Sequence, residues 1–389
     1  MDVPNDPKHT RTTLNNTLYI NDWQSLSALG STQTEIWNQY LDSATLLSNI
    51  QGYISAPLSE TNNATLKDIA ANDRRFNKLD RSVLMALFCA LQLKKRNEFE
   101  NPMVNIGSSR GATDSWEQQF SHFKKNNNCK VDASPSTTLG NISSWVGQVI
   151  SKNEINFSHS ITCSTFHHSV LNAAAWLHSG MSQEAIVGAS EAPLTSFGIA
   201  QMKGLGIYAD NDDEFPVKAF QLNKTGGAMA LGEAAILFDL SATPNKAKFK
   251  ISGMGWGTEY ITHGSSISKN GESLQKAMRM ALQKANSSDI DIVVTHSPGT
   301  YKGDLAEHEA IKAVFDKMPA CTNNKWKIGH TFGASGGMSL EMALMMLDNQ
   351  QFIGLPYIND QITPDKIERI LINTVGFGGN AVSLIVEKV

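Results

Sequence analysis

Hydrophobic residues along the chain follow two alternating spacings. Short, nearly continuous apolar runs, typical of buried strands, occur at 103–107, 184–190 and 289–297. Longer segments with apolar residues three and four positions apart, such as 76–96 and 271–285, predict amphipathic helices. The alternation of strands with helices predicts an α/β fold in which helices cover buried sheets.

The order of predicted elements in the first part of the chain is repeated in the second. A polar linker, SATPNKAK at 241–248, separates two predicted strands and marks the boundary between the repeats. We therefore predict an N-terminal half at 14–240 and a C-terminal half at 241–389. The acidic stretch at 194–223 is predicted to be irregular and to lie on the surface.

Composition narrows the class of protein. The 389 residues are 41% hydrophobic and 18% charged, which predicts a globular chain with a large core. The net charge of −4 argues against a nucleic-acid partner. No run reaches the roughly 18–20 apolar residues of a membrane span, and the polar N-terminus lacks the apolar segment of a secretory signal. Four scattered cysteines without a CxxC motif predict no metal site and a reduced, cytoplasmic setting.

One cysteine is placed where a nucleophile could be. Cys163, in TCSTFHH, lies where a predicted strand at 155–163 meets the start of a helix. Free N–H groups and the positive end of the helix dipole would lower the pKa of a thiol there and favour the nucleophilic thiolate. A buried, inert cysteine is the alternative that this segment alone leaves open.

Two histidines and a glycine-rich turn are further candidates. His296 ends the predicted strand at 289–297, and His330 lies in a turn of small residues, KIGHTFGASGG. Each histidine could face a cleft or could be structural. The run from Gly376 to Gly379, GFGG, places glycine where a β-hairpin disfavours it. It therefore predicts either a loop that moves or contacts a ligand, or a plain tight turn.

Together these segments resemble the motifs of the β-ketoacyl synthases, the condensing enzymes of fatty-acid and polyketide assembly. TCS resembles their nucleophile motif, THSPGTYKGDLAEHEA resembles HGTGT-x-x-GD-x-x-E, KWKIGH resembles K-x-x-IGH, and GFGG resembles their gating loop. The resemblance implies five catalytic positions: Cys163, His296, Glu307, Lys325 and His330. It implies five substrate-binding positions: Met229, Thr300, Gly376, Phe377 and Gly378.

The resemblance also implies a fold and a reaction. The fold is thiolase-like, with two pseudo-repeated βαβαβαββ halves that form a five-layered αβαβα core. Cys163 would accept an acyl group from acyl carrier protein as a thioester. A malonyl thioester would then lose carbon dioxide, and its enolate would attack the acyl group. The growing chain is carried on the phosphopantetheine of acyl carrier protein, so no separate cofactor is expected.

Specific roles follow from the same resemblance. His296 and His330 would stabilise the enolate oxygen, and the backbone N–H groups of Cys163 and Phe377 would stabilise the thioester oxyanion. An ion pair between Lys325 and Glu307 would hold the histidines in place. The family dimerises, so we expect either a homodimer or a heterodimer with a related ketosynthase or chain-length factor.

Two histidines favour an elongating, decarboxylating synthase, but the chain departs from the family pattern in places. Ser297 and Pro298 stand where the family has Gly and Thr, and Met229 stands where it has Phe. VKAFQ replaces R-P-F-D, and the final motif is one residue short. These departures indicate a specialised polyene, aryl-polyene or polyketide-like pathway. The alternatives are a non-catalytic partner of the chain-length-factor type and a thiolase or acyltransferase that works without decarboxylation.

Overall fold

The computed structural model describes residues 17–151, 155–211, 213–224, 228–264 and 266–389. The predicted start of the N-terminal half, at residue 14, lies outside the described residues. The predicted boundary after residue 240 falls one residue before the end of strand β8 (Ala234–Ser241) and stays a prediction.

Ten strands form one sheet that consists of two arms of five strands each. The N-terminal arm has the order β1 (Leu18–Ser27), β8 (Ala234–Ser241), β6 (Glu184–Glu191), β4 (Met103–Gly107) and β5 (Ile155–Phe157). The C-terminal arm has the order β9 (Phe249–Thr258), β13 (Asn380–Lys388), β12 (Arg369–Gly376), β10 (Ile292–Val294) and β11 (Ala320–Thr322).

The two arms have the same strand order and the same strand directions. In each arm the first three strands are antiparallel to their neighbours and the last two are added in parallel. Antiparallel pairing of the start of β1 with the start of β9 joins the arms. A separate small sheet contains β2 (Ser48–Ile50), β3 (Tyr53–Ala56) and β7 (Leu231–Gly232).

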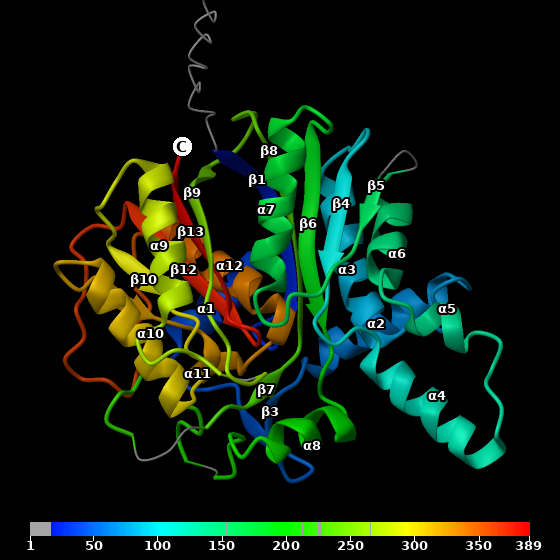
Figure 1. The fold of residues 1–389 in the computed structure, drawn as a ribbon. Helices are drawn as coiled ribbons and strands as arrows, with labels where there is room; N and C mark the ends of the chain where they lie inside the picture. The colour runs from blue at the N-terminus through cyan, green and yellow to red at the C-terminus, as the bar shows by residue number, and fades with distance from the viewer. Residues whose placement is uncertain (1–16, 152–154, 212, 225–227, 265) are drawn as a thin grey trace, which may run out of the picture.

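Helices cover both faces of both arms and produce five layers (Figure 1). Helices α7 (Thr165–His178) and α12 (Ser335–Asn349) lie between the arms, where their side chains join those of the facing strands in one hydrophobic cluster. A second cluster joins α3 (Arg81–Arg96) and α6 (Asn141–Ile150) to the outer face of the N-terminal arm. A third joins α9 (Glu272–Ala285) and α10 (Tyr301–Val314) to the outer face of the C-terminal arm.

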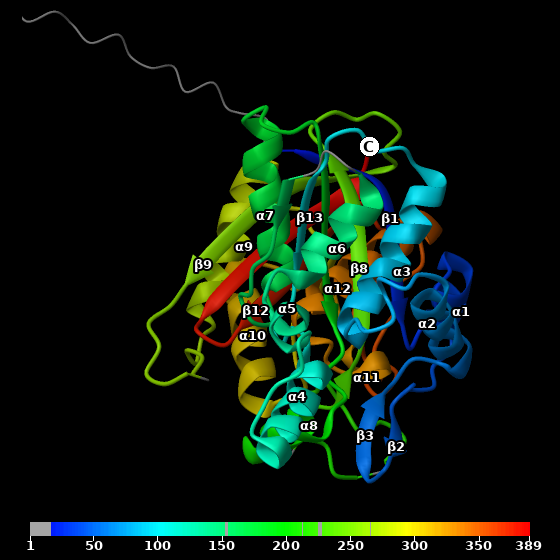
Figure 2. The same ribbon diagram turned by 90° about the vertical axis from the view of Figure 1, so that its right-hand side faces the viewer.

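The predicted five-layered α/β fold is thus confirmed. Other helices lie around this core, with α4 and α5 on the side that faces the viewer in Figure 2. They are α1 (Gln33–Leu41), α2 (Glu60–Asn72), α4 (Thr113–Asn126), α5 (Ala133–Thr137), α8 (Ser196–Gly204), α11 (Lys325–Ile328) and the 3-10 turn η1 (Phe332–Ala334). Of the helices in the described ranges, none is both long and apolar enough to cross a membrane.

Several predicted elements have different bounds. The strand predicted at 155–163 is only β5, because the chain turns before Cys163 and Thr162 takes a left-handed φ of 47°. The helix predicted from residue 76 begins at Arg81, because the Asp80 side chain accepts from the Ser82 N–H and caps it. The segment at 194–223 is not wholly irregular, since Thr195 caps helix α8 within it.

A buried carboxyl group lies in the central layer and affects stability. Glu341 of α12 accepts hydrogen bonds at one oxygen from Ser25 Oγ at 2.7 Å and Trp23 Nε1 at 3.2 Å. Its other oxygen has no partner among the described residues. Burial raises the pKa of Glu341 to about 7. The folded state therefore keeps the proton that the unfolded state releases near pH 4.5.

We expect this group to make the protein less stable as pH rises. Between pH 4.5 and pH 7 Glu341 is ionised in the unfolded state but still protonated in the folded state. The free energy of unfolding therefore falls by about 3 kcal/mol over this range. Glu341→Gln removes this cost, so the variant should gain stability relative to the wild type over that range. Denaturant unfolding at pH 5 and pH 7.5 measures the effect, with Glu98→Gln as an exposed control. The prediction is contradicted if the difference in the free energy of unfolding between wild type and variant is the same at pH 5 and at pH 7.5.

Candidate active site

The segment around Cys163 forms a sharp turn into helix α7. Thr162, in the left-handed region, precedes the cysteine, and the helix begins two residues after it at Thr165. The Thr165 hydroxyl donates to the Thr162 carbonyl at 2.6 Å and accepts from the Ile161 N–H at 2.9 Å. These bonds fix the turn, so the thiol is held at the amino end of the helix as predicted.

The GFGG turn between β12 and β13 packs directly on this segment. The Thr162 hydroxyl donates to the Phe377 carbonyl at 3.2 Å. A Cβ on Gly376 would lie 1.9 Å from Thr162 Oγ1 and 3.0 Å from the Cys163 nitrogen, so only glycine permits the contact. Gly378 has a φ of 91°, which also favours glycine. The Phe377 side chain is 41% exposed at this place.

The structure brings both candidate histidines to the cysteine. His330 Nε2 and Cys163 Sγ are 3.2 Å apart. The rings of His296 and His330 have centroids 5.3 Å apart and are nearly perpendicular. One ligand atom from each of the three residues lies within 4.8 Å of the others, and all three residues are buried. The three reactive groups therefore surround one small volume.

These three side chains are also the group that could most readily hold a metal ion. Within the described residues they form the one set of three or more His, Cys, Asp or Glu that is compact enough. A catalytic zinc site takes three such ligands and keeps a fourth position open. The residues therefore fit either a metal or direct thiol chemistry, and the predicted absence of a metal stays a prediction.

Burial sets the protonation of the site. Burial, together with the charge of Glu191, raises the pKa of the Cys163 thiol to about 12. Burial and the charge of Lys325 lower the pKa of His330 to about 3 and hold that of His296 well below its usual value. The net shift of the thiol pKa is upward, because the loss of hydration outweighs the lowering by the backbone hydrogen bond at Cys163. At neutral pH the site holds a thiol and two neutral imidazoles.

Glu307 supports the backbone beside His296. Its carboxylate accepts from the His296 N–H at 2.9 Å, from the Ser297 N–H at 2.7 Å and hydroxyl at 2.9 Å, and from Asn373 Nδ2 at 3.1 Å. Four donors on one carboxylate fix the turn that carries the histidine.

The expected ion pair between Lys325 and Glu307 is not a direct contact. The Lys325 ammonium donates to the Thr295 carbonyl at 3.3 Å and to Ser339 Oγ at 3.5 Å, while the four donors already occupy the Glu307 oxygens. Burial lowers the pKa of Lys325 to about 8, and the nearby Glu307 charge opposes that shift. The two charges therefore interact electrostatically without direct contact, and the role of this ion pair in holding the histidines stays a prediction.

A cavity of about 580 Å³ opens over the reactive groups. Eight of the ten candidates line it: Cys163, Met229, His296, Thr300, Glu307, His330, Gly376 and Phe377. Lys325 is buried but does not line the cavity. Gly378 lies in the turn between β12 and β13, next to Phe377, which does.

The lining differs in polarity from place to place. Apolar side chains from Met202, Ile207 and Phe332 line part of it, and Tyr301 and Lys302 supply polar groups elsewhere. Sequence reasoning missed Met202, because helix α8 was not predicted. It also missed Phe332, which stands two residues after His330.

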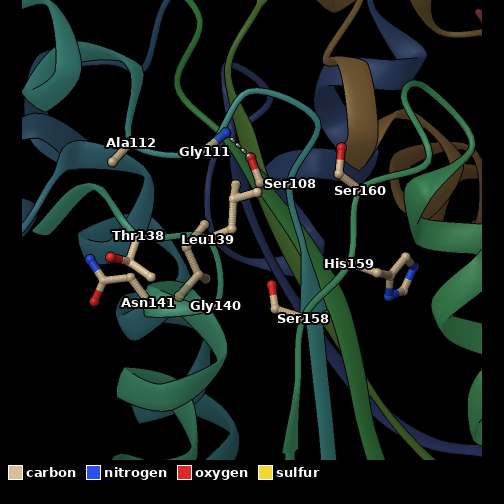
Figure 3. A pocket seen from close by; sticks show the side chains of 11 residues that line it. Ser108, Gly111, Ala112, Thr138, Leu139, Gly140, Asn141, Ser158, His159 and Ser160 are labelled. Carbon is tan, nitrogen blue, oxygen red and sulfur yellow. Dashed lines mark hydrogen bonds between the residues drawn. The ribbon is translucent and has the colours of Figure 1, made fainter. Parts of the chain in front are cut away.

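A second, smaller cavity lies nearby but contains none of the candidates. It measures about 80 Å³, room for only a few water molecules. Figure 3 shows its lining, in which small and hydroxyl side chains lie beside Leu139, Asn141 and His159, and the Ser108 hydroxyl accepts from the Gly111 N–H at 2.8 Å. The His159 ring contacts Asn105 Oδ1 at 3.0 Å and the Thr165 carbonyl at 3.1 Å, so both its nitrogens are used. The larger cavity is therefore the candidate active site.

Comparison with known families gives two matches that together cover most of the chain. The model for the beta-ketoacyl synthase N-terminal domain matches residues 21–241, and that for the C-terminal domain matches 249–356. The 3-oxoacyl-[acyl-carrier-protein] synthase 1 of Haemophilus influenzae is 28% identical over 60% of this chain and 62% of that protein. Synthase 2 of Staphylococcus aureus is 24% identical over 96% of this chain and 99% of its own length.

Solved structures share the fold at lower identity. The ishigamide ketosynthase/chain length factor superposes with a TM-score of 0.81 at 16% identity, over 96% of this chain and 99% of that one. A type II polyketide synthase acyl-carrier protein in complex with its ketosynthase gives a TM-score of 0.80 at 17% identity, over 96% and 99%. The overall architecture is therefore shared well beyond the conserved motifs.

Because the pKa of Cys163 is raised to about 12, its reaction with iodoacetamide should be slow at pH 7.5 and should accelerate about tenfold per pH unit up to pH 9 or beyond. Peptide mass spectrometry follows the reaction and separates Cys163 from the exposed Cys129, which serves as the internal reference. Equal alkylation rates at Cys163 and Cys129 at pH 7.5 would show that burial does not lower the reactivity of the Cys163 thiol.

Proposed function

The chain belongs to the β-ketoacyl synthase family, and on that premise we propose that it is an acyltransferase that condenses an acyl group on Cys163 with malonyl–acyl carrier protein. The product is a 3-oxoacyl–acyl carrier protein, and carbon dioxide is released. The contact between Cys163 Sγ and His330 Nε2, with His296 beside it in one cavity, is the observation that carries the proposal.

The first step moves the acyl group to the cysteine. The Cys163 sulfur attacks the thioester carbonyl of acyl–acyl carrier protein, and the carrier thiol leaves. Because the site is neutral at rest, the thiol proton must leave as the new carbon–sulfur bond forms. His330 Nε2, at 3.2 Å, is the base within reach, and it passes the proton on to the departing carrier sulfur, so that His330 is neutral again when the step ends. Backbone N–H groups of Cys163 and Phe377 are assigned to the oxyanion of this step.

The second step breaks the malonyl carbon–carbon bond. Carbon dioxide leaves, and the electron pair becomes an enolate whose oxygen carries the charge. His296 and His330 are neutral, so each can present one N–H to that oxygen. The enolate carbon then attacks the acyl–cysteine thioester, and the Cys163 sulfur leaves as a thiolate that takes one proton from solvent water; that proton balances the carboxylate lost as carbon dioxide. Glu307 and Lys325 act by holding the histidine turn and its electrostatic environment.

The remaining candidates are assigned to substrate binding. Thr300, beside the polar side chains of the lining, is assigned to the phosphopantetheine arm. Met229 forms part of the apolar cluster around Cys163 and is assigned to the substrate pocket. Phe377, between Gly376 and Gly378, is assigned to the gate. Two of the departures from the family pattern, Pro298 and Met229, line the cavity, which supports a specialised acyl chain.

We also propose the partners and the setting. Acyl carrier protein delivers both substrates, and no further cofactor takes part. Two solved structures of similar fold, described as a ketosynthase/chain length factor and as an acyl-carrier protein in complex with its ketosynthase, support a carrier partner and a paired subunit. That subunit is either a second copy or a related chain. The proposed location is the cytoplasm, and the proposed halves are 14–240 and 241–389.

Cys163→Ala should abolish acylation. Incubation of the wild type with acyl–acyl carrier protein should add the mass of one acyl group, and intact-mass measurement detects it. Cys321→Ala, a variant of a cysteine outside the cavity lining, should still be acylated. The absence of an acyl adduct on the wild-type protein would contradict the proposal and would indicate a non-catalytic partner.

His296→Ala should impair decarboxylation more than acylation, by about 100-fold, because one of two enolate donors is lost. Release of carbon dioxide from malonyl–acyl carrier protein measures decarboxylation, and the acyl adduct on Cys163 measures acylation. Acylation without malonyl decarboxylation in the wild type would instead indicate a thiolase or simple acyltransferase. Normal decarboxylation in the variant would contradict the role of His296 in stabilising the enolate.

A further inference from the structure

Glu191, the last residue of β6, is a fully buried carboxylate with no part in the proposed chemistry. It accepts hydrogen bonds from Ser108 Oγ at 3.0 Å, from Ser109 Oγ at 2.7 Å, from the Ser109 N–H, and from the Gly333 N–H at 3.0 Å. All four donors are neutral. A buried charge held by neutral donors is expensive to keep, so its place in the site calls for a reason.

The four donors come from two loops that are far apart in sequence. Ser108 and Ser109 follow β4 in the N-terminal part, whereas Gly333 lies in the 3-10 turn η1 that follows His330. A Cβ at Gly333 would come within 2.5 Å of Glu191 Oε1 and 3.1 Å of the Ser109 nitrogen. The carboxylate therefore joins the two loops at a contact that only glycine allows.

Phe332, next to Gly333, is held in an unfavourable conformation. Its φ is 43°, in the left-handed region, which costs a side-chain-bearing residue about 1 kcal/mol or more. Its ring lies 5.5 Å from the His330 ring, and the Arg110 guanidinium lies 4.9 Å from the Phe332 ring centroid. Glu191 thus controls both sides of Phe332, through Gly333 on one side and through Ser109, the neighbour of Arg110, on the other.

The His330 ring depends on this packing. Its Nδ1 has no hydrogen-bond partner among the described residues. A catalytic histidine is usually oriented by a bond at the nitrogen that does not react. Here the contacts of the ring with Phe332 and His296 must do so instead.

We propose that Glu191 is a positioning residue of the active site: by holding Gly333 and Ser109 it fixes Phe332, which in turn orients His330 against Cys163. The inference rests on the proposed function, since it assigns the support of the same reactive pair. A second consequence follows from charge, because the Glu191 carboxylate adds to the burial that raises the pKa of the Cys163 thiol. The residue therefore orients the base and also keeps the nucleophile protonated at rest.

Two substitutions separate position from charge. Glu191→Gln keeps an oxygen for Ser109 and Gly333, and its amide can donate to the Ser108 hydroxyl, so the geometry is retained and the charge is removed. Its Cys163 should react with iodoacetamide at least about threefold faster than the wild type at pH 8, with a pH profile shifted to lower pH. Glu191→Ala removes the bonds as well, and its condensation rate should fall by about 10- to 100-fold.

The control residue lies on the same strand as Glu191. Glu184, at the other end of β6, is partly buried, so Glu184→Gln and Glu184→Ala should leave both readouts unchanged. The proposal fails if folded Glu191→Ala condenses at the wild-type rate, or if Glu191→Gln shows the wild-type alkylation profile. If Glu191→Ala does not fold, Ser109→Ala removes one of the four bonds and should still lower condensation measurably. Alkylation needs no substrate, so it tests Glu191 even if the wild type proves unable to take an acyl group.

Discussion

The close packing of helices α7 and α12 in the central layer determines where the reactive groups meet. A Cβ on Gly336 would lie 2.9 Å from the His167 ring, and one on Gly337 would lie 2.4 Å from Ile236 and 3.0 Å from Phe166. Glycines at these two places let the first turn of α12 approach α7 and the sheet. Because Cys163 stands just before α7 and His330 stands shortly before α12, the approach of the two helices also brings sulfur and imidazole within 3.2 Å.

The second constraint is the exclusion of water from this meeting point. Burial makes a charged thiolate–imidazolium pair unfavourable, so the resting site is neutral and charge must appear only as a substrate reacts. Neutral imidazoles suit the stabilisation of an enolate, since each keeps one N–H to donate. The fixed charges nearby, on Glu307 and Glu191, are surrounded by backbone and hydroxyl donors, which limits the cost of burying them.

Local patterns predicted the α/β class, and the resemblance of several motifs to a known family supplied the five-layered arrangement and the reactive residues, since each segment alone left a structural alternative open. Strand and helix periodicities repeat along the chain, and Cys163, His296 and His330 each lie in a recognisable motif at the end of an element. The failures are contacts and conformations without a local signal. The left-handed turn at Thr162 shortened a predicted strand, and backbone, hydroxyl and amide donors, rather than the Lys325 ammonium, contact the Glu307 oxygens. Glu191 escaped notice because its partners come from two distant loops.

The repeat also explains why neither half suffices for the chemistry. Strands β4, β5 and β6 in one arm occupy the same places as β10, β11 and β12 in the other. Cys163 and His330 precede the corresponding helices α7 and α12, and the turn at His296 corresponds to the loop at Ser108 and Ser109. The residues at these matched places differ: one half supplies the nucleophile, and the other supplies both imidazoles. Glu191 and the GFGG turn, at the ends of the matched strands β6 and β12, each contact the other half. The active site is therefore a property of the interface between the repeats, and its geometry depends on contacts that cross it.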